Sequence, residues 1–159
     1  MKKIFALLIT ASLIFSLCAC GKTTEKGKNT ANATTSGIPD DVINITEKMY
    51  VTYINEIYTN TSDYIGKTIK IEGMFDAYLD ESNGTTYYYV YRTGPGCCGN
   101  DGAMCGFEFT YNGKMPNEKD WIEVIGKLRQ YTENGNSYLT LDAQSLTVKN
   151  ERGAETVYN

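Results

Sequence analysis

Two segments far apart in the chain follow one pattern, in which an apolar residue, a polar residue, an apolar residue and any residue precede a glycine. They are Ile69–Gly73 and Ile122–Gly126. Alternation of apolar and polar residues is typical of a strand that buries one face. The glycine allows such a strand to coil sharply around a tight barrel. The two segments therefore favour a small β-barrel.

Alternation elsewhere predicts five strands in all, the first beginning at residue 67 and the others over residues 85–92, 105–111, 121–131 and 138–148. Asn83-Gly84 and Gly135 supply turn signals between strands. Because closure removes exposed strand edges, we predict a mainly β domain over residues 42–150, a small five-stranded OB-like antiparallel barrel. An open five-stranded sheet packed on a helix is the alternative. Residues 151–159 are expected to form a C-terminal tail.

One α-helix is expected before the first strand. Apolar residues recur there at the spacing of a single helix face, at Tyr50, Tyr53, Ile54, Ile57 and Tyr58. Thr46 is placed to cap the start of this helix, and Asn60 is placed to end it. The prediction is therefore a barrel with one N-terminal helix.

The start of the chain has the pattern of an export signal over residues 1–19. Lys2 and Lys3 precede an apolar stretch, residues 4–17, which is too short to span a bilayer as a mature anchor. The stretch leads into Leu17-Cys18-Ala19-Cys20-Gly21, which resembles the lipobox of bacterial lipoproteins. We therefore expect Cys20 to carry lipid, palmitate included, and to hold the protein on the outer face of the cell membrane. An ordinary signal peptide is the alternative.

Charge and composition limit the partners of the mature chain. Residues 20–41, which follow the cleavage site, are polar and nearly free of large apolar side chains, so we expect a flexible tether. The mature chain keeps 13 of the 15 basic residues and all 19 acidic residues, a formal charge of −6. This acidic balance argues against nucleic acid as a partner.

Three of the five cysteines lie within nine residues, in a glycine-rich segment. Cys97, Cys98 and Cys105, with Asp101, offer three thiolates and one carboxylate to a soft metal ion such as zinc, copper or iron. A disulfide from Cys97 or Cys98 to Cys105 is the competing interpretation outside the cytoplasm, and it leaves one thiol over. The third interpretation is three reduced thiols with no function.

Enzymatic chemistry finds little support in the sequence. The chain has no histidine, which removes Ser-His-Asp and Cys-His arrangements, and no phosphate-binding glycine motif occurs. We therefore predict that the protein is not an enzyme. Tyr87, Tyr89 and Tyr91 share one face of a predicted strand, where they suit either stacking on a ligand or structural packing.

Several sequence segments within residues 45–150 resemble the C-terminal domain of the YcgQ-like family of permease subunits. They are residues 55–60, 64–73 and 121–126, and the pattern Cys97-Cys98-x-x-Asp101 followed by Gly106. The resemblance implies an OB-like extracytoplasmic domain of unknown activity, associated with a permease. Two features depart from the family. Its members carry the domain behind membrane helices, and they usually have an aliphatic residue in place of Cys105.

These observations predict a membrane-anchored, extracytoplasmic OB-like module whose cysteine loop binds a soft metal ion or holds a disulfide, as an accessory to a permease or another membrane protein. The alternative is an interaction scaffold that presents its tyrosine face to a partner, with structural cysteines only. A thiol oxidoreductase is a third possibility.

Overall fold

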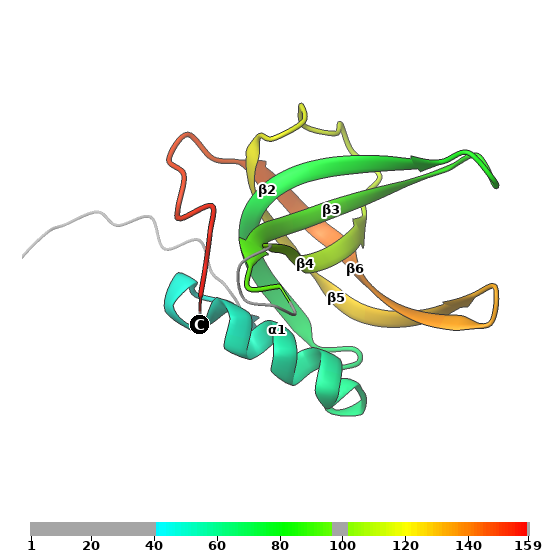
Figure 1. Ribbon diagram of the computed structural model, residues 1–159, viewed down its shortest axis with the longest axis horizontal. Helices are drawn as coiled ribbons and strands as arrows, with labels where there is room; N and C mark the ends of the chain where they lie inside the picture. Colours follow the sequence, from blue (N-terminus) through cyan, green and yellow to red (C-terminus); the bar gives the residue numbers. More distant parts are fainter. Residues whose placement is uncertain (1–40, 97–101, 159) are drawn as a thin grey trace, which may run out of the picture. The chain divides into compact units, whose positions relative to one another are not determined.

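The computed structural model describes residues 41–96 and 102–158, and in these residues it has six strands and one α-helix (Figure 1). The helix is α1 (Tyr50–Thr59), flanked by short 3-10 helices at Glu47–Met49 and Thr61–Asp63. The strands are β1 (Val42–Asn44), β2 (Thr68–Asp80), β3 (Thr85–Gly94), β4 (Ala103–Thr110), β5 (Trp121–Glu133) and β6 (Asn136–Val148).

The five long strands close into a barrel. β2 pairs with β3, β3 with β4, β4 with β6 and β6 with β5, and β5 returns to β2. The predicted five-stranded OB-like barrel with one helix is confirmed. The prediction made every pairing antiparallel, whereas β4 and β6 are parallel. In a closed ring of five strands the directions cannot alternate all the way round, so a parallel contact is unavoidable.

The two glycines of the repeated pattern lie where a neighbouring strand approaches closely. A β-carbon on Gly73 would lie 2.5 Å from the carbonyl oxygen of Tyr91 in β3. A β-carbon on Gly126 would lie 2.8 Å from the carbonyl oxygen of Asp142 in β6. The β5–β6 register also shifts between Ile125 and Gly126. The absence of a side chain at both positions therefore permits the tight coiling of β2 and β5.

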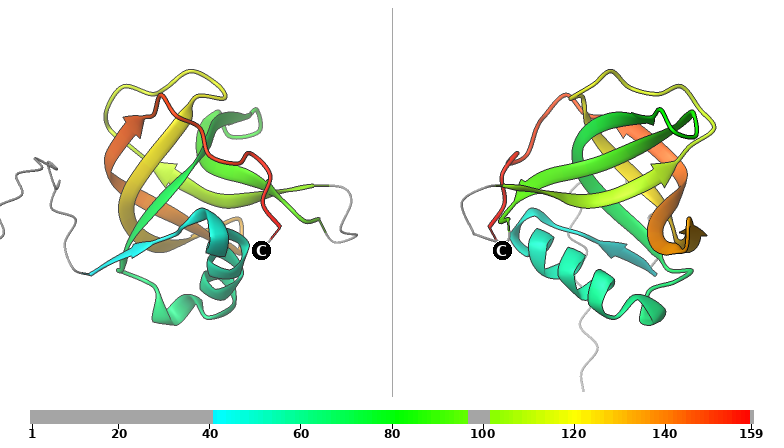
Figure 2. Two further views of the ribbon diagram at one scale, coloured as in Figure 1. Left: turned by 90° about the vertical axis from the view of Figure 1, so that its left-hand side faces the viewer. Right: turned by 45° about the vertical axis from the view of Figure 1, so that its right-hand side comes forward.

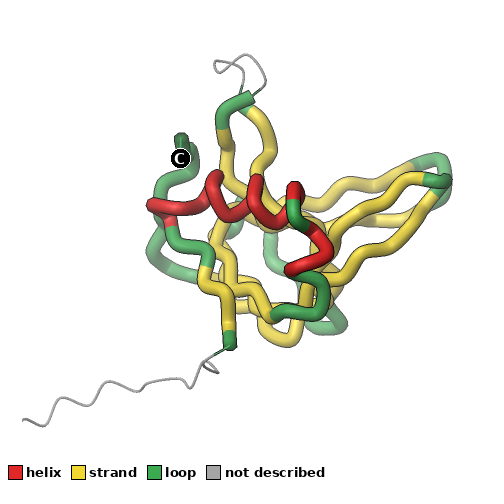
Figure 3. The backbone as a smooth tube through the Cα atoms, turned by 90° about the horizontal axis from the view of Figure 1, so that it is seen from below, coloured by secondary structure: helices red, strands yellow, loops and turns green. Residues whose placement is uncertain are grey.

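Helix α1 lies across one end of the barrel, which Figure 3 shows from the helix side. It buries four side chains, Tyr50, Val51, Ile54 and Ile57. The predicted end of the helix at Asn60 is confirmed, since the Asn60 amide donates to the carbonyl of Glu56. Thr46 precedes the first 3-10 turn, but its side chain makes no capping hydrogen bond. In residues 41–96 and 102–158, no helix combines the length and apolar character needed to cross a membrane.

Residues 151–158, the predicted tail, lie against the domain. The amide of Thr93, near the end of β3, donates to the carbonyl oxygen of Glu155, and the amide of Val157 donates to the carbonyl oxygen of Thr93. Val157 is buried in the core. Figure 2 shows the segment running back along the barrel toward the start of α1.

Buried Arg92 holds this segment, β3 and the start of the helix together. Its guanidinium lies 4.8 Å from the ring centres of both Tyr50 and Trp121. It donates to Glu47 at 2.9 Å and to the carbonyl oxygen of Ala154 at 3.1 Å. The buried charge is thereby paired and hydrogen-bonded, as a buried guanidinium requires.

Candidate functional site

The long hairpins β2–β3 and β5–β6 extend on the same side of the barrel (Figures 1 and 3). A pocket of about 170 Å³ lies between them. Its walls carry five tyrosines: Tyr78, Tyr87, Tyr89, Tyr131 and Tyr138. Three acidic side chains lie among them: Asp80, Glu108 and Glu133. We call these eight residues the tyrosine groove.

Strand register brings these side chains together. Tyr78 lies opposite Tyr87 in the β2–β3 ladder, and Tyr89 lies opposite Glu108 in the β3–β4 ladder. In the second hairpin, Tyr131 of β5 lies opposite a tyrosine of β6, and the two rings stack with centres 5.5 Å apart. Opposite residues of an antiparallel pair point to the same face. The cross-strand pairs that stabilise the hairpins therefore also form the walls of the groove.

Two hydrogen bonds cross the groove between strands that are not neighbours in the sheet. The Tyr87 hydroxyl of β3 donates to Glu133 of β5, 2.8 Å from both carboxylate oxygens. The Tyr131 hydroxyl of β5 donates to Glu108 of β4 at 2.7 Å. Asn83, at the tip of the first hairpin, donates to the Tyr87 hydroxyl at 3.1 Å. These bonds tie the hairpins together and fix the orientation of the rings.

The groove carries negative charge. Burial raises the pKa of Glu108, and the hydrogen bond to Glu133 raises the pKa of Tyr87. Burial, followed by the bond to Glu108, raises the pKa of Tyr131. These tyrosines are therefore neutral at physiological pH, while the carboxylates of Glu133 and Asp80 supply negative charge.

Arg129 lies at the rim, and its charge is already compensated. Its guanidinium is held by two side-chain oxygens of Asp142 at 2.8 to 3.1 Å. It also lies over the ring of Tyr131, 5.7 Å from the ring centre. A cation therefore already rests against an aromatic ring at this site.

Two further hollows adjoin the groove. One, of about 350 Å³, extends along the end of β4 and shares Tyr87 and Tyr131 with the groove. The other, of about 200 Å³, shares Tyr89 and Tyr138 and reaches Tyr58 of α1. Together they make a continuous concave face on β3, β4 and the two hairpins.

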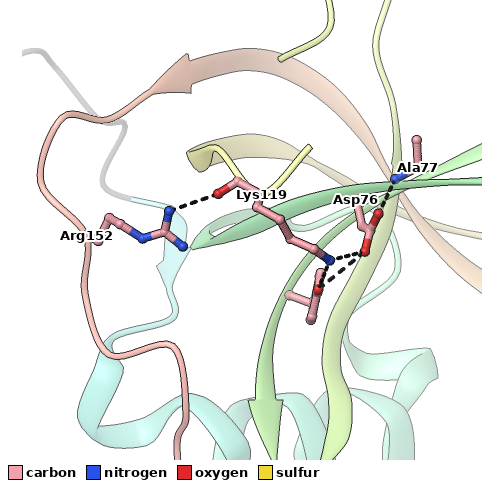
Figure 4. Close-up of polar contacts among 5 residues, drawn as sticks. Asp76, Ala77, Lys119 and Arg152 are labelled. Atoms are coloured by element: carbon pink, nitrogen blue, oxygen red, sulfur yellow. Dashed lines mark hydrogen bonds and ion pairs between the residues drawn. The ribbon is translucent and has the colours of Figure 1, made fainter. Parts of the chain in front are cut away.

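The predicted tyrosine face is only partly a site. Tyr87 and Tyr89 line the groove, but Tyr91 is buried with Met74 and Trp121 in a second small cluster. The Tyr91 hydroxyl accepts a hydrogen bond from Lys119, which also pairs with Asp76. Figure 4 shows the side chain of Lys119 reaching toward Asp76, while the guanidinium of Arg152 donates to the backbone carbonyl oxygen of Lys119.

This network is structural. Its hydrogen bonds to Asp76 and Tyr91 raise the pKa of Lys119, which keeps the amine charged and unsuited to act as a nucleophile or base.

Most of the predicted cysteine site lies outside the described residues: Cys97, Cys98 and Asp101 are not among them. Cys105 is the third residue of β4, opposite Arg92, and is half-buried against the core. A β-carbon on Gly94 would lie 3.4 Å from its sulfur, so the thiol lies against the base of the β3–β4 loop. Burial raises the pKa of the Cys105 thiol, which disfavours the reactive thiolate.

No cluster of three metal-ligating side chains occurs among residues 41–96 and 102–158. The predicted lipid site, Cys20, also lies outside the described part of the chain.

The sequence profile of the DUF1980 C-terminal domain matches residues 20–159. The chain belongs to this family. The prediction made from the Ile69–Gly73 segment and the cysteine pattern is thereby confirmed. None of the curated proteins compared with this DUF1980 domain matches it. A solved structure, the dimeric N-terminal domain of PriB from Thermoanaerobacter tencongensis, is 18% identical with a TM-score of 0.32; the match covers 53% of this chain and 97% of that one. A similarity this slight has no bearing on function.

Most residues of the groove in this DUF1980 domain were missed from the sequence. Tyr78 comes from the β2–β3 hairpin, whereas Tyr131 and Tyr138 come from the β5–β6 hairpin. Glu108 and Glu133 meet their tyrosine partners only once the barrel has closed. The available signal was the abundance of tyrosine, 13 residues in the chain, with acidic residues on the same predicted strands.

Proposed function

We propose that the chain is a membrane-anchored binding module on the outer face of the cell membrane, without enzymatic activity, and that it takes its ligand in the tyrosine groove. The observation that carries this proposal is the pair of hydrogen bonds from Tyr87 to Glu133 and from Tyr131 to Glu108. They hold the walls of a concave site in place before a ligand arrives. A pre-organised site loses little conformational freedom on binding.

The position of the groove supports the same role. OB-folds bind ligands on the face of their second and third strands and between two neighbouring hairpin loops. Here β3 and β4 are the second and third barrel strands, and β2–β3 and β5–β6 are the two hairpins. The negative charge of the mature chain disfavours nucleic acid as the ligand.

The sequence supports the proposed anchor. We propose that Cys20, at the end of the lipobox-like segment, carries the lipid and that the residues up to 41 act as a tether. A permease or another membrane protein is the proposed recipient of the bound ligand. Replacement of Cys20 by serine should release the protein from the membrane fraction. Retention of the Cys20→Ser protein there would contradict lipid anchoring.

Fragment mapping tests the binding role while the ligand is still unidentified. Small polar and aromatic fragments are screened by NMR against the full mature chain and against a Tyr78→Ala, Tyr138→Ala variant. We expect the perturbed resonances to cluster in the groove, and the double variant to lose them. Clustering elsewhere, or no perturbation in the groove, would contradict the proposal.

The cysteine loop is a second candidate function, a soft-metal site or a disulfide formed by Cys97, Cys98, Asp101 and Cys105. The placement of the Cys105 sulfur against the base of this loop favours it. Zinc or copper is the metal expected from thiolate ligands. Intact mass after alkylation, with and without reductant, counts the free thiols, and elemental analysis of the same sample reports metal. Three free thiols without metal would leave the cysteines a structural role only.

A further inference from the structure

We infer that the tyrosine groove binds an organic cation of the quaternary ammonium class. This inference rests on the proposed binding role of the groove and specifies the chemistry of its ligand. The pocket volume of about 170 Å³ suits a small ligand group, since a water molecule takes about 30 Å³ of liquid.

The first argument is the supply of ring faces. Five tyrosines surround the pocket, and two of them present much of their surface to solvent, with Tyr78 62% exposed and Tyr138 42% exposed. The face of an aromatic ring attracts a cation within about 6 Å of its centre. Arg129 already occupies one such position, over Tyr131.

The second argument is charge. Asp80, Glu108 and Glu133 lie among the rings, while Arg129 at the rim is compensated by Asp142. The walls therefore carry negative charge that no cationic side chain of the lining neutralises, considering the described residues only. A cationic ligand gains from this field, and an anionic ligand is repelled.

The third argument concerns what a quaternary ammonium ion needs from its site. The hydroxyls of Tyr87 and Tyr131 donate to Glu133 and Glu108, which fixes these carboxylates beside the rings. A quaternary ammonium ion has no N–H, so ring faces and negative surroundings suffice to hold it.

Calorimetric titration of the full lipidated chain in nanodiscs of anionic lipid tests the inference. The probes are tetramethylammonium, choline and 3,3-dimethyl-1-butanol, the neutral isostere of choline. We expect both cations to bind and the isostere to bind at least about tenfold more weakly, because it fills the same space without the charge. Equal binding of choline and the isostere would overturn the inference, since the pocket would then select for shape and apolar surface alone.

Variants locate the binding. A Tyr78→Leu, Tyr138→Leu variant, which keeps apolar bulk, should weaken tetramethylammonium binding about tenfold. Glu133→Gln keeps a hydrogen-bond acceptor for Tyr87 and should weaken binding about threefold. Tyr158→Leu is the matched control, since Tyr158 is 78% exposed and lies outside the groove, and should leave binding unchanged. Thermal unfolding of each variant verifies folding. Cation binding that survives the double variant would overturn the inference.

Further experiments distinguish a soluble cation from a lipid headgroup, and the cation inference from the proposed binding role. Free choline is compared with vesicles of phosphatidylcholine, with phosphatidylglycerol vesicles as the reference, so that a soluble ligand is distinguished from a lipid headgroup. Chitobiose is titrated in parallel. Its binding in the groove, with no binding of cations, would overturn the quaternary ammonium inference and leave the binding role standing. Failure of the fragment mapping would overturn the binding role itself.

Discussion

The hydroxyl of Tyr87 lies 2.8 Å from each carboxylate oxygen of Glu133, although β3 and β5 are not neighbours in the barrel. The bond spans the space between the outer parts of the two hairpins, beyond the residues at which the β2–β5 ladder joins them. It therefore controls how far the hairpins separate, and with them the width of the tyrosine groove.

Replacement of Tyr87 by phenylalanine removes this bond and the exposed bond that the hydroxyl accepts from Asn83, and it keeps the ring. We expect a loss of about 0.5 to 1.5 kcal/mol in the free energy of unfolding, since the bond to Glu133 is lost and the exposed bond from Asn83 contributes little. Amide exchange at the tip of the β5–β6 hairpin should become faster. Urea unfolding and hydrogen exchange measure the two effects. Tyr158→Phe is the control, and equal behaviour of the two variants would show that the Tyr87 bond does not stabilise the hairpins.

Glu108 gives a pH-dependent prediction. Burial raises its pKa in the folded protein, so its contribution to stability is fully present below the unfolded pKa and is lost as pH rises through the folded value. Glu108→Gln removes this loss and keeps an acceptor for Tyr131. The variant should therefore gain stability relative to the wild type as pH rises from about 4 to 7, by less than about 1.4 kcal/mol because the side chain is only half-buried.

The difference between the two unfolding curves, measured at each pH, isolates this residue. Asp76 and Asp142 have lowered pKa values through their cationic partners, so their stabilisation is lost as pH falls. That loss is common to both proteins and cancels. A difference that does not change with pH would show that Glu108 is solvated as well in the folded chain as in the unfolded chain.

Arg92 should not tolerate lysine. Its planar guanidinium lies between Tyr50 and Trp121 and donates in several directions, which an ammonium group on a flexible stem cannot reproduce. We expect Arg92→Lys to cost at least about 2 kcal/mol in urea unfolding, since hydrogen bonds to charged groups contribute about 1.5 to 3 kcal/mol. Arg152→Lys, also beside Trp121 but 41% exposed, is the matched control and should cost less than about 1 kcal/mol.

Gly126 tests the barrel geometry. A methyl group there would meet the backbone of β6, at 2.8 Å from the carbonyl oxygen of Asp142 and 2.9 Å from the α-carbon of Ala143. Gly126→Ala should therefore cost about 1 to 3 kcal/mol. Gly135→Asn is the control, since Gly135 has φ 81° with open space around it, and asparagine tolerates this conformation. Equal thermal unfolding of the two variants would contradict the close packing at Gly126.

The barrel was largely predictable because its signals are local. The segments Ile69–Gly73 and Ile122–Gly126 encode strand, buried face and coiling together, and Asn83-Gly84 encodes a turn that the structure has, with φ 70° at Gly84. The alternation that marks the first strand stops after residue 73, although β2 continues to Asp80. The reason is that Met74 and Phe75 are both buried, one in each cluster.

The groove could not be predicted in the same way. Tyr131 meets Glu108, and Tyr87 meets Glu133, only after the barrel has closed. Closure and register are set by the whole chain, so no short segment indicates these contacts. β1 was missed because its three residues are too few to show a period.

The most direct test of the groove as a ligand site is a set of intermolecular nuclear Overhauser effects between tetramethylammonium methyl protons and tyrosine ring protons of the full chain. We expect effects to Tyr78 and Tyr138, and their loss when Glu108 and Glu133 are both replaced by glutamine. Effects to Tyr158 alone, or none to any tyrosine at saturating ligand, would contradict a cation site between the two hairpins.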